Sequence, residues 1–171
     1  MQAKWKVLSA TLKGSGAGYH QPRLEPGALA SRYYAGRAVI RETKELVGNR
    51  TILAYAALWR CRDPFWYELG TVWVGECLRG NGVRDELMAE LLQRVPEDRD
   101  LFFITPVEAI MRSGEKLGFV PVTTQTHPLI LEWACRAGIV SRLPSSVHPI
   151  APGLWGTPKG GQRWLFWRRS G

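Results

Sequence analysis

The sequence contains few of the residues that build disulfide frameworks and metal centres. Of its 171 residues only three are cysteine and three are histidine, and no C-x-x-C pair or histidine spacing typical of a metal site occurs. An odd number of widely separated cysteines argues against a disulfide framework, so we expect reduced thiols and a cytoplasmic protein. We expect no bound metal.

Long apolar runs are also missing. No stretch approaches the ~18 consecutive apolar residues of a membrane-spanning helix, and Met1 to Lys6 lacks the apolar core of a signal peptide. The hydrophobic content is nevertheless 45%, which excludes general disorder. The length predicts a single domain over residues 1–171 with a core of its own and no membrane partner.

Acidic residues are scarce at both ends of the chain. Residues 1–41 hold seven Lys or Arg and one acid, and residues 133–171 hold six and none. The middle, residues 42–132, holds fourteen acids against ten basic residues, and the whole chain carries +8. These basic flanks allow two interpretations. They form a surface for RNA or an acidic protein face, or they serve solubility and attract an anionic cofactor.

The most informative feature that is present is a glycine turn between an apolar strand and a helix. The strand ends at Val72 to Val74, Gly80 and Gly82 follow closely, and an amphipathic run extends from Asp85 to Val95. Glycines without a Cβ allow the backbone to adopt positive φ and approach a phosphate. Free N–H groups at the start of the helix would then bind the anion.

Two arginines flank this turn. Arg79 and Arg84 lie near the positive end of the helix dipole, where cations are unfavourable unless an anion lies between them. They therefore favour a phosphate ligand weakly. The alternative is an ordinary strand-to-helix turn with solvated arginines.

The surrounding elements appear in a recognisable order. A strand is expected over Thr51 to Arg60 and an antiparallel partner over Trp66 to Val74. After the glycine turn and its helix come an apolar strand at Leu101 to Thr105, a second helix and Lys116-Leu117-Gly118-Phe119-Val120. Over roughly Ile52 to Val122 this order resembles the GNAT superfamily of acyl-CoA-dependent N-acyltransferases. The resemblance implies an α+β fold with a mixed, mostly antiparallel central sheet, splayed central strands and flanking helices.

The resemblance also implies a cosubstrate, acetyl-CoA, and the residues that hold it. The strand residues would pair with the pantetheine arm, and the glycine turn would bind the pyrophosphate. The implied cofactor-binding residues are Val72, Trp73, Val74, Arg79, Gly80, Asn81, Gly82, Val83 and Arg84.

Glu68 matches a glutamate that serves as general base in some members of the superfamily, directly or through water. The alternative for Glu68 is a half-buried strand residue paired with a basic neighbour. Gly114 stands where many members carry the tyrosine that protonates the leaving thiolate, and Val107 where many carry asparagine. Possible substitute donors are Tyr67, Ser113 and His127, for which the alternatives are strand packing, an exposed helix position and a loop.

Two functions remain open. The first is an N-acetyltransferase that transfers the acetyl group from acetyl-CoA to an amine on a protein, an aminoacyl-tRNA or a small molecule. The second is a catalytically inactive relative that binds a macromolecule through its basic flanks. Glu68 and the glycine turn favour the first, whereas Gly114 and Val107 favour the second.

The flanks carry weaker patterns. Alternation over Trp5 to Leu12 predicts an opening strand, and helices are expected over Ala28 to Ala38 and Leu129 to Ala137. A proline- and glycine-rich loop is expected from Leu143 to Gly161. In the last strand, Gln162 to Arg169, aromatic residues alternate with arginines, which suits either nucleic-acid stacking or packing on the core.

Overall fold

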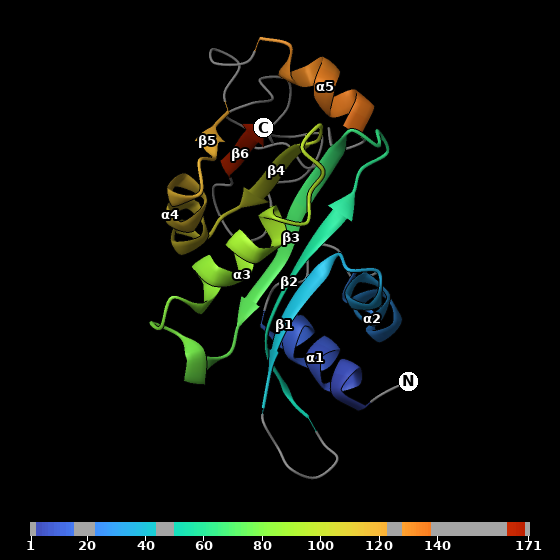
Figure 1. Cartoon of the computed structure of the whole chain (residues 1–171), viewed down its shortest axis with the longest axis vertical. Helices are drawn as coiled ribbons and strands as arrows, with labels where there is room; N and C mark the ends of the chain where they lie inside the picture. The colour runs from blue at the N-terminus through green and yellow to red at the C-terminus, as the bar shows by residue number, and fades with distance from the viewer. Residues whose placement is uncertain (1–2, 16–22, 44–49, 123–127, 138–163, 170–171) are drawn as a thin grey trace. The chain divides into compact units, whose positions relative to one another are not determined.

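The computed structural model describes residues 3–15, 23–43, 50–122, 128–137 and 164–169 (Figure 1). Its strands form a six-stranded sheet in the order β1-β2-β3-β4-β6-β5. The chain divides into two compact units, Met1–Leu58 with Gly70–Arg94, and Trp59–Leu69 with Val95–Gly171. We call them the first and the second unit and describe each separately. The single domain expected from the length stays a prediction.

The first unit begins with a helix where the sequence predicted a strand. Helix α1 (Ala3–Gly14) buries Trp5, Leu8 and Leu12, which contribute one face at spacings of three and four residues. That spacing is helical, so the expected strand over Trp5 to Leu12 is wrong. The apparent alternation came from small and charged residues between these three apolar positions.

Helix α2 (Pro26–Tyr34) is shorter than expected, because Gly36 adopts φ +70° and the chain then enters a strand. Strand β1 (Ala38–Glu42) was not predicted. It pairs antiparallel with β2 (Ile52–Arg60), with Ala38 opposite Ala57. The run from Ala54 to Trp59 in β2 is buried at every position, as expected for a strand covered on both faces.

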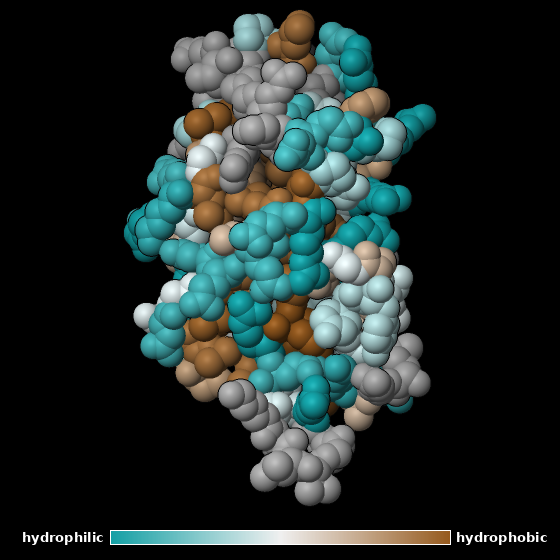
Figure 2. Space-filling view, in the orientation of Figure 1, coloured by the Kyte–Doolittle hydropathy of each residue, from teal (hydrophilic) through white to brown (hydrophobic). Residues whose placement is uncertain are grey.

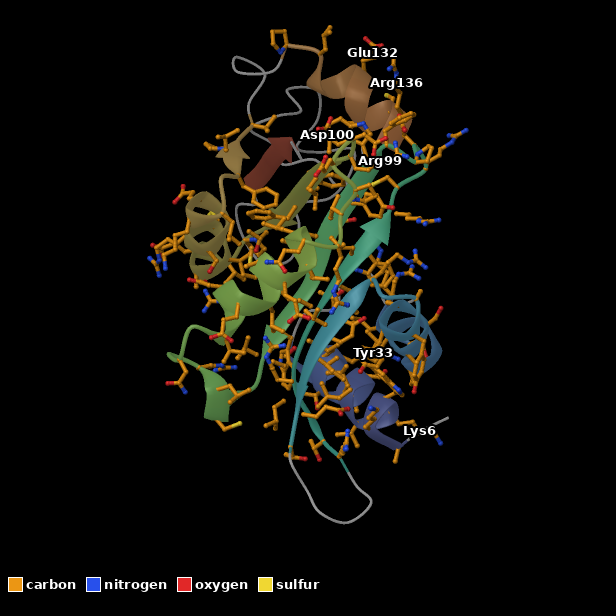
Figure 3. All side chains as sticks on the ribbon, viewed as in Figure 1. Lys6, Tyr33, Arg99, Asp100, Glu132 and Arg136 are labelled. Atoms are coloured by element: carbon orange, nitrogen blue, oxygen red, sulfur yellow. The ribbon has the colours of Figure 1, made fainter. Side chains whose placement is uncertain are left out.

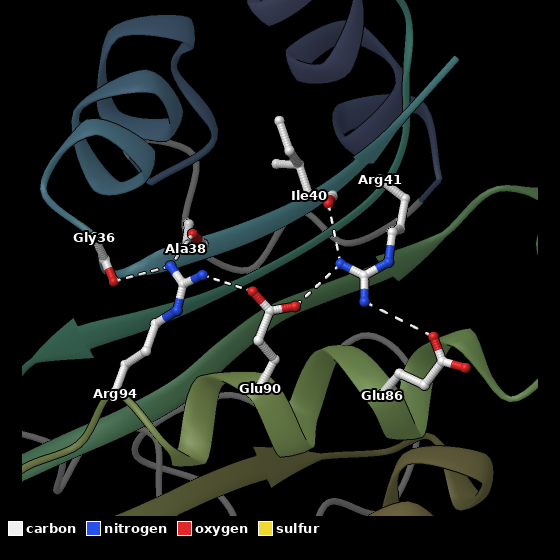
Figure 4. A network of polar contacts seen from close by, with 7 residues as sticks. All are labelled: Gly36, Ala38, Ile40, Arg41, Glu86, Glu90 and Arg94. Carbon is white, nitrogen blue, oxygen red and sulfur yellow. Dashed lines mark hydrogen bonds and ion pairs between the residues drawn. The ribbon is translucent and has the colours of Figure 1, made fainter. Parts of the chain in front are cut away.

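Strand β3 (Trp66–Val74) leads through a short 3-10 helix, η2 (Glu76–Leu78), into α3 (Val83–Leu92). The predicted amphipathic helix therefore exists and begins two residues earlier than expected. Its buried side chains are Leu87, Met88 and Leu91, and the face turned to the viewer in Figure 2 is mostly hydrophilic. In the first unit, α3 lies on one side of β1 while α1 and α2 lie on the other (Figures 1 and 4).

The second unit contains β4 (Asp100–Thr105), α4 (Glu108–Lys116), β5 (Val120–Pro121), α5 (Ile130–Ala137) and β6 (Trp164–Arg169). Strand β4 pairs in parallel with the start of β3 and antiparallel with β6, and β5 pairs antiparallel with β6. The sheet is therefore mixed, and the expected α+β class is confirmed. The expected last strand is also present, between β4 and β5 in the sheet order.

Some expectations fall on residues that the structure does not describe, namely His127 and the loop from Leu143 to Gly161. Among the described helices, none combines the length and apolar character needed to cross a membrane.

Candidate cofactor and catalytic site

The end of β3 is held against β2 by Gly75, a residue that no sequence motif indicated. Its N–H donates to the carbonyl oxygen of Leu53 at 2.8 Å. A Cβ on Gly75 would lie 2.9 Å from the same oxygen, so a side chain there would push the two segments apart. The position of this glycine directly after a predicted strand is the sequence feature that could have indicated the close approach.

Strand β3 is irregular just before this point. Thr71 has φ +55°, the only positive φ of a non-glycine residue in the described part of the chain. Such a residue interrupts the alternation of a strand in the manner of a β-bulge and stores local strain. The last strand residues, Val72, Trp73 and Val74, are all partly exposed.

The glycine turn has the backbone that the sequence predicted. Gly80 has φ +81° and Gly82 has φ +75°, and Gly82 is the N-cap of α3. An added Cβ would meet no atom within 4 Å at either position. Backbone conformation, rather than crowding by the protein, therefore requires glycine here.

The turn presents several N–H groups to an incoming ligand. Among the described residues, the backbone N–H groups of Gly80, Asn81, Gly82 and Val83 have no hydrogen-bond acceptor of normal geometry. The first satisfied N–H beyond Arg84 and Asp85 is that of Glu86, which donates to the Gly82 carbonyl at 3.1 Å. Consecutive N–H groups at a helix start form an anion-binding cradle.

The two arginines of the turn differ in their surroundings. The Arg79 side chain is 62% exposed, and it makes only long contacts, Nε to the Val74 carbonyl at 3.4 Å and Nη1 to Glu76 Oε1 at 3.7 Å. It can therefore reorient toward an anion at low cost. Arg84 is partly buried and already engaged within the protein.

Glu68, the predicted general base, is 6% exposed and lies opposite Phe102 of β4 in the parallel pairing. It is more buried than the half-buried strand residue of the alternative, and it interacts with another group of the protein. The cradle belongs to the first unit and Glu68 to the second, together with Tyr67.

The position expected for a catalytic tyrosine is blocked. A Cβ on Gly114 would lie 2.5 Å from Cζ and 2.6 Å from Cε1 of Phe103. The Phe103 ring is buried and meets the Phe119 ring edge-on at a centroid distance of 5.0 Å. Helix α4 therefore packs on β4 through a ring that occupies the space of a side chain at residue 114.

The other candidate donors in the described part of the chain are buried. Ser113 is buried rather than exposed, and its hydroxyl donates to the Ala109 carbonyl of the same helix at 3.0 Å. Tyr67 is also buried. Val107 is the N-cap of α4 without a capping side chain, and its own N–H donates to Thr105 Oγ1 at 3.0 Å.

No family model matches the sequence, and no curated protein is detectably similar to it. Solved structures do match. A ribosomal-protein-alanine N-acetyltransferase from Brucella melitensis is similar at TM-score 0.61 and 15% identity, over 99% of this chain and 96% of that one. YncA of Salmonella typhimurium, a putative acetyltransferase solved with acetyl-CoA, is similar at TM-score 0.59 and 14% identity, over 98% and 86%.

An acetyltransferase of the GNAT family from Staphylococcus aureus Mu50 is similar at TM-score 0.55 and 11% identity, over 98% of this chain and 92% of that one. This chain has the GNAT fold. At these identities the likeness establishes the fold and not the substrate, and the roles of individual residues stay predictions.

Proposed function

We propose that this protein is an acetyl-CoA-dependent N-acetyltransferase, with the glycine turn as its pyrophosphate site. The observation that carries the proposal is the row of N–H groups from Gly80 to Val83, which have no acceptor among the described residues and lie at the start of α3. Arg79 would add a mobile positive charge beside them. Val72, Trp73 and Val74 would pair with the pantetheine arm, and Arg84 would complete the loop.

In the proposed reaction the acceptor nitrogen attacks the thioester carbon, and the bond from that carbon to sulfur breaks. Glu68 would take the proton that leaves the acceptor amine, directly or through a water molecule. Its burial suits this role, since a carboxylate shielded from bulk water interacts strongly with a nearby proton donor.

The leaving thiolate would receive its proton from water or from the substrate. No side chain at residue 114 can supply it, because Phe103 fills that space. Ser113 donates its hydroxyl to Ala109 and is not oriented for that purpose. The acceptor remains an amine on a protein, an aminoacyl-tRNA or a small molecule.

Cofactor binding is tested by thermal denaturation with CoA. A ligand at about one hundred times its Kd adds about 2.7 kcal/mol to the free energy of unfolding, which raises the Tm of a domain this size by roughly 5–10 °C. An unchanged Tm at millimolar CoA would overturn the proposal.

Turnover is tested by thiol release from acetyl-CoA with a panel of amines, peptides and charged tRNA. Glu68→Gln keeps the size of the side chain but cannot accept the proton, so we expect kcat to fall about 10²- to 10⁴-fold while the Tm shift with CoA persists. Equal rates in the two proteins would remove Glu68 from the mechanism.

The second candidate, a catalytically inactive protein that binds RNA or an acidic protein, rests on the basic flanks. Several of their charges are already used internally. Lys4 pairs with Glu42 at 2.5 Å, Lys13 with Glu25 at 2.7 Å, and Arg136 with Glu132 at 2.6 Å. The last pair lies on α5 (Figure 3).

Two cationic side chains of the N-terminal flank favour this candidate, one on α1 and one that follows α2. Among the described residues, Lys6 (Figure 3) and Arg37 have no acidic partner within ion-pair distance. Burial and the positive charge of Arg37 lower the pKa of Arg32. A gel shift with RNA at increasing salt tests the candidate, and no retardation at low salt would exclude RNA binding.

A further inference from the structure

Helix α3 carries an arrangement of charge that is unfavourable for the anion proposed to bind at its start. Asp85 and Glu86 lie in its first turn and Glu90 one turn later. These carboxylates suit the helix dipole in the absence of ligand, but they would repel the phosphates of a cofactor bound at Gly80 to Val83. Other residues must neutralise these negative charges if the site is to bind an anion tightly.

Arg41, on the edge strand β1, reaches two of the three carboxylates (Figure 4). Its Nη1 donates to Glu90 Oε2 at 3.1 Å, and its Nη2 lies 3.7 Å from Glu86 Oε2. The same Nη1 also contacts the carbonyl of Ile40 at 3.2 Å, which fixes the guanidinium between strand and helix.

Arg94 completes the network from the other end of α3. Its Nη2 donates to Glu90 Oε1 at 2.6 Å, and its Nη1 donates to the carbonyls of Ala38 and Gly36 at 3.0 and 3.2 Å. Glu90 is therefore shared by two arginines, and α3 is attached to the edge of β1 at both ends of this network (Figure 4). Of these two arginines, only Arg41 also reaches Glu86, which lies in the first turn of α3.

We infer that Arg41 is a positioning residue for the cofactor: it neutralises Glu86 and Glu90 and thereby raises the affinity of the glycine turn for an anionic ligand. This inference rests on the proposed function. It differs from a purely structural role, in which Arg41 would only attach α3 to β1. In that case Arg94, which makes more backbone contacts, would matter at least as much.

The test measures the Kd of CoA by calorimetry for Arg41→Met and for Arg94→Met as the matched control. We expect Arg41→Met to raise Kd about three- to tenfold at low ionic strength, since Glu86 and Glu90 lose a neutralising charge. The difference should shrink in about 0.5 M salt. Arg94→Met should leave Kd within about twofold of the unsubstituted protein, even if it lowers the Tm as much as Arg41→Met does.

Rescue separates charge from packing. The triple variant Arg41→Met, Glu86→Gln, Glu90→Gln should return Kd to within about twofold of the unsubstituted protein, and Arg41→Lys should preserve it. Should Arg41→Met not fold, Glu86→Gln alone still tests the inference, because removing that carboxylate should leave CoA binding as tight or tighter.

The possible failures are distinguishable. An unchanged Kd in Arg41→Met, a loss that the triple variant does not recover, or weaker CoA binding by Glu86→Gln would overturn the inference and leave the proposed function standing. If the unsubstituted protein does not bind CoA, the proposed function fails and the inference fails with it.

Discussion

The ring of Phe103 lies where a side chain on Gly114 would begin, with Cζ 2.5 Å from the place of a Cβ. This contact gives a physical reason for the glycine at residue 114, where the resemblance led us to expect a tyrosine. Helix α4 approaches β4 so closely that only glycine fits at residue 114. The aromatic pair of Phe103 and Phe119 occupies the space that a side chain there would need. The absence of a side chain at residue 114 is therefore coupled to packing of the core.

Gly114→Ala should destabilise the protein by about 1–3 kcal/mol, because the added methyl group overpacks a buried contact. Denaturant unfolding measures the change. Gly14→Ala is the matched control, since Gly14 also belongs to a helix but has no atom within 4 Å of an added Cβ. It should be neutral or stabilising. Recovery of stability in Gly114→Ala combined with Phe103→Leu would establish the ring as the cause, and equal stabilities of the two alanine variants would contradict it.

Gly82→Ala should weaken CoA binding, because φ +75° is unfavourable for alanine and the turn would relax away from the cradle geometry. The matched control is Gly36→Ala. Gly36 has φ +70° and equally open surroundings, but it lies between α2 and β1. Both variants should lose about 1–2 kcal/mol of stability. Only Gly82→Ala should reduce the Tm shift with CoA, and an equal reduction in both would assign the effect to general destabilisation.

Thr71→Gly should raise the free energy of unfolding by up to about 1 kcal/mol, since glycine adopts φ +55° without the strain that threonine carries there. Val72→Gly, one residue later in β3 and without positive φ, should lower stability instead, because glycine weakens a regular strand position. Chemical denaturation of the two variants compares them directly. A destabilised Thr71→Gly would show that the threonine side chain makes contacts worth more than the strain.

The buried phenol of Tyr55 should make the free energy of unfolding depend on pH in the alkaline range. The side chain is fully buried in the first unit, its hydroxyl lies 3.4 Å from the Leu29 carbonyl, and burial raises the pKa of the phenol above its ordinary value. A raised pKa in the folded state means that the folded protein holds the proton more tightly. The resulting contribution to the free energy of unfolding is complete below about pH 10, which is the pKa of the phenol in the unfolded chain. It is lost as pH rises above that value.

Between about pH 9 and pH 11, the free energy of unfolding should therefore fall less steeply with pH in Tyr55→Phe than in the unsubstituted protein. Urea unfolding at a series of pH values measures the two slopes. Parallel slopes would show that Tyr55 does not titrate differently in the folded state.

The local elements of the middle of the chain followed from the sequence. The bounds of β3 were predicted as Trp66 to Val74, and the glycine turn was recognised because Gly80 and Gly82 need positive φ. Periodicity was misread where small residues intervene. Trp5, Leu8 and Leu12 form a helical face, and the short strand β1 after Gly36 carried too few residues to produce a pattern.

The sequence by itself determined what depends on neighbours along the chain: the order of elements from Ile52 to Val122 and the backbone of the glycine turn. Only the tertiary structure decided what depends on residues far apart in sequence. The Phe103 ring that excludes a side chain at Gly114, and the Arg41 contacts to Glu86 and Glu90 across 45 and 49 positions, belong to this class. Such contacts arise from the packing of separate segments, and no local pattern encodes them.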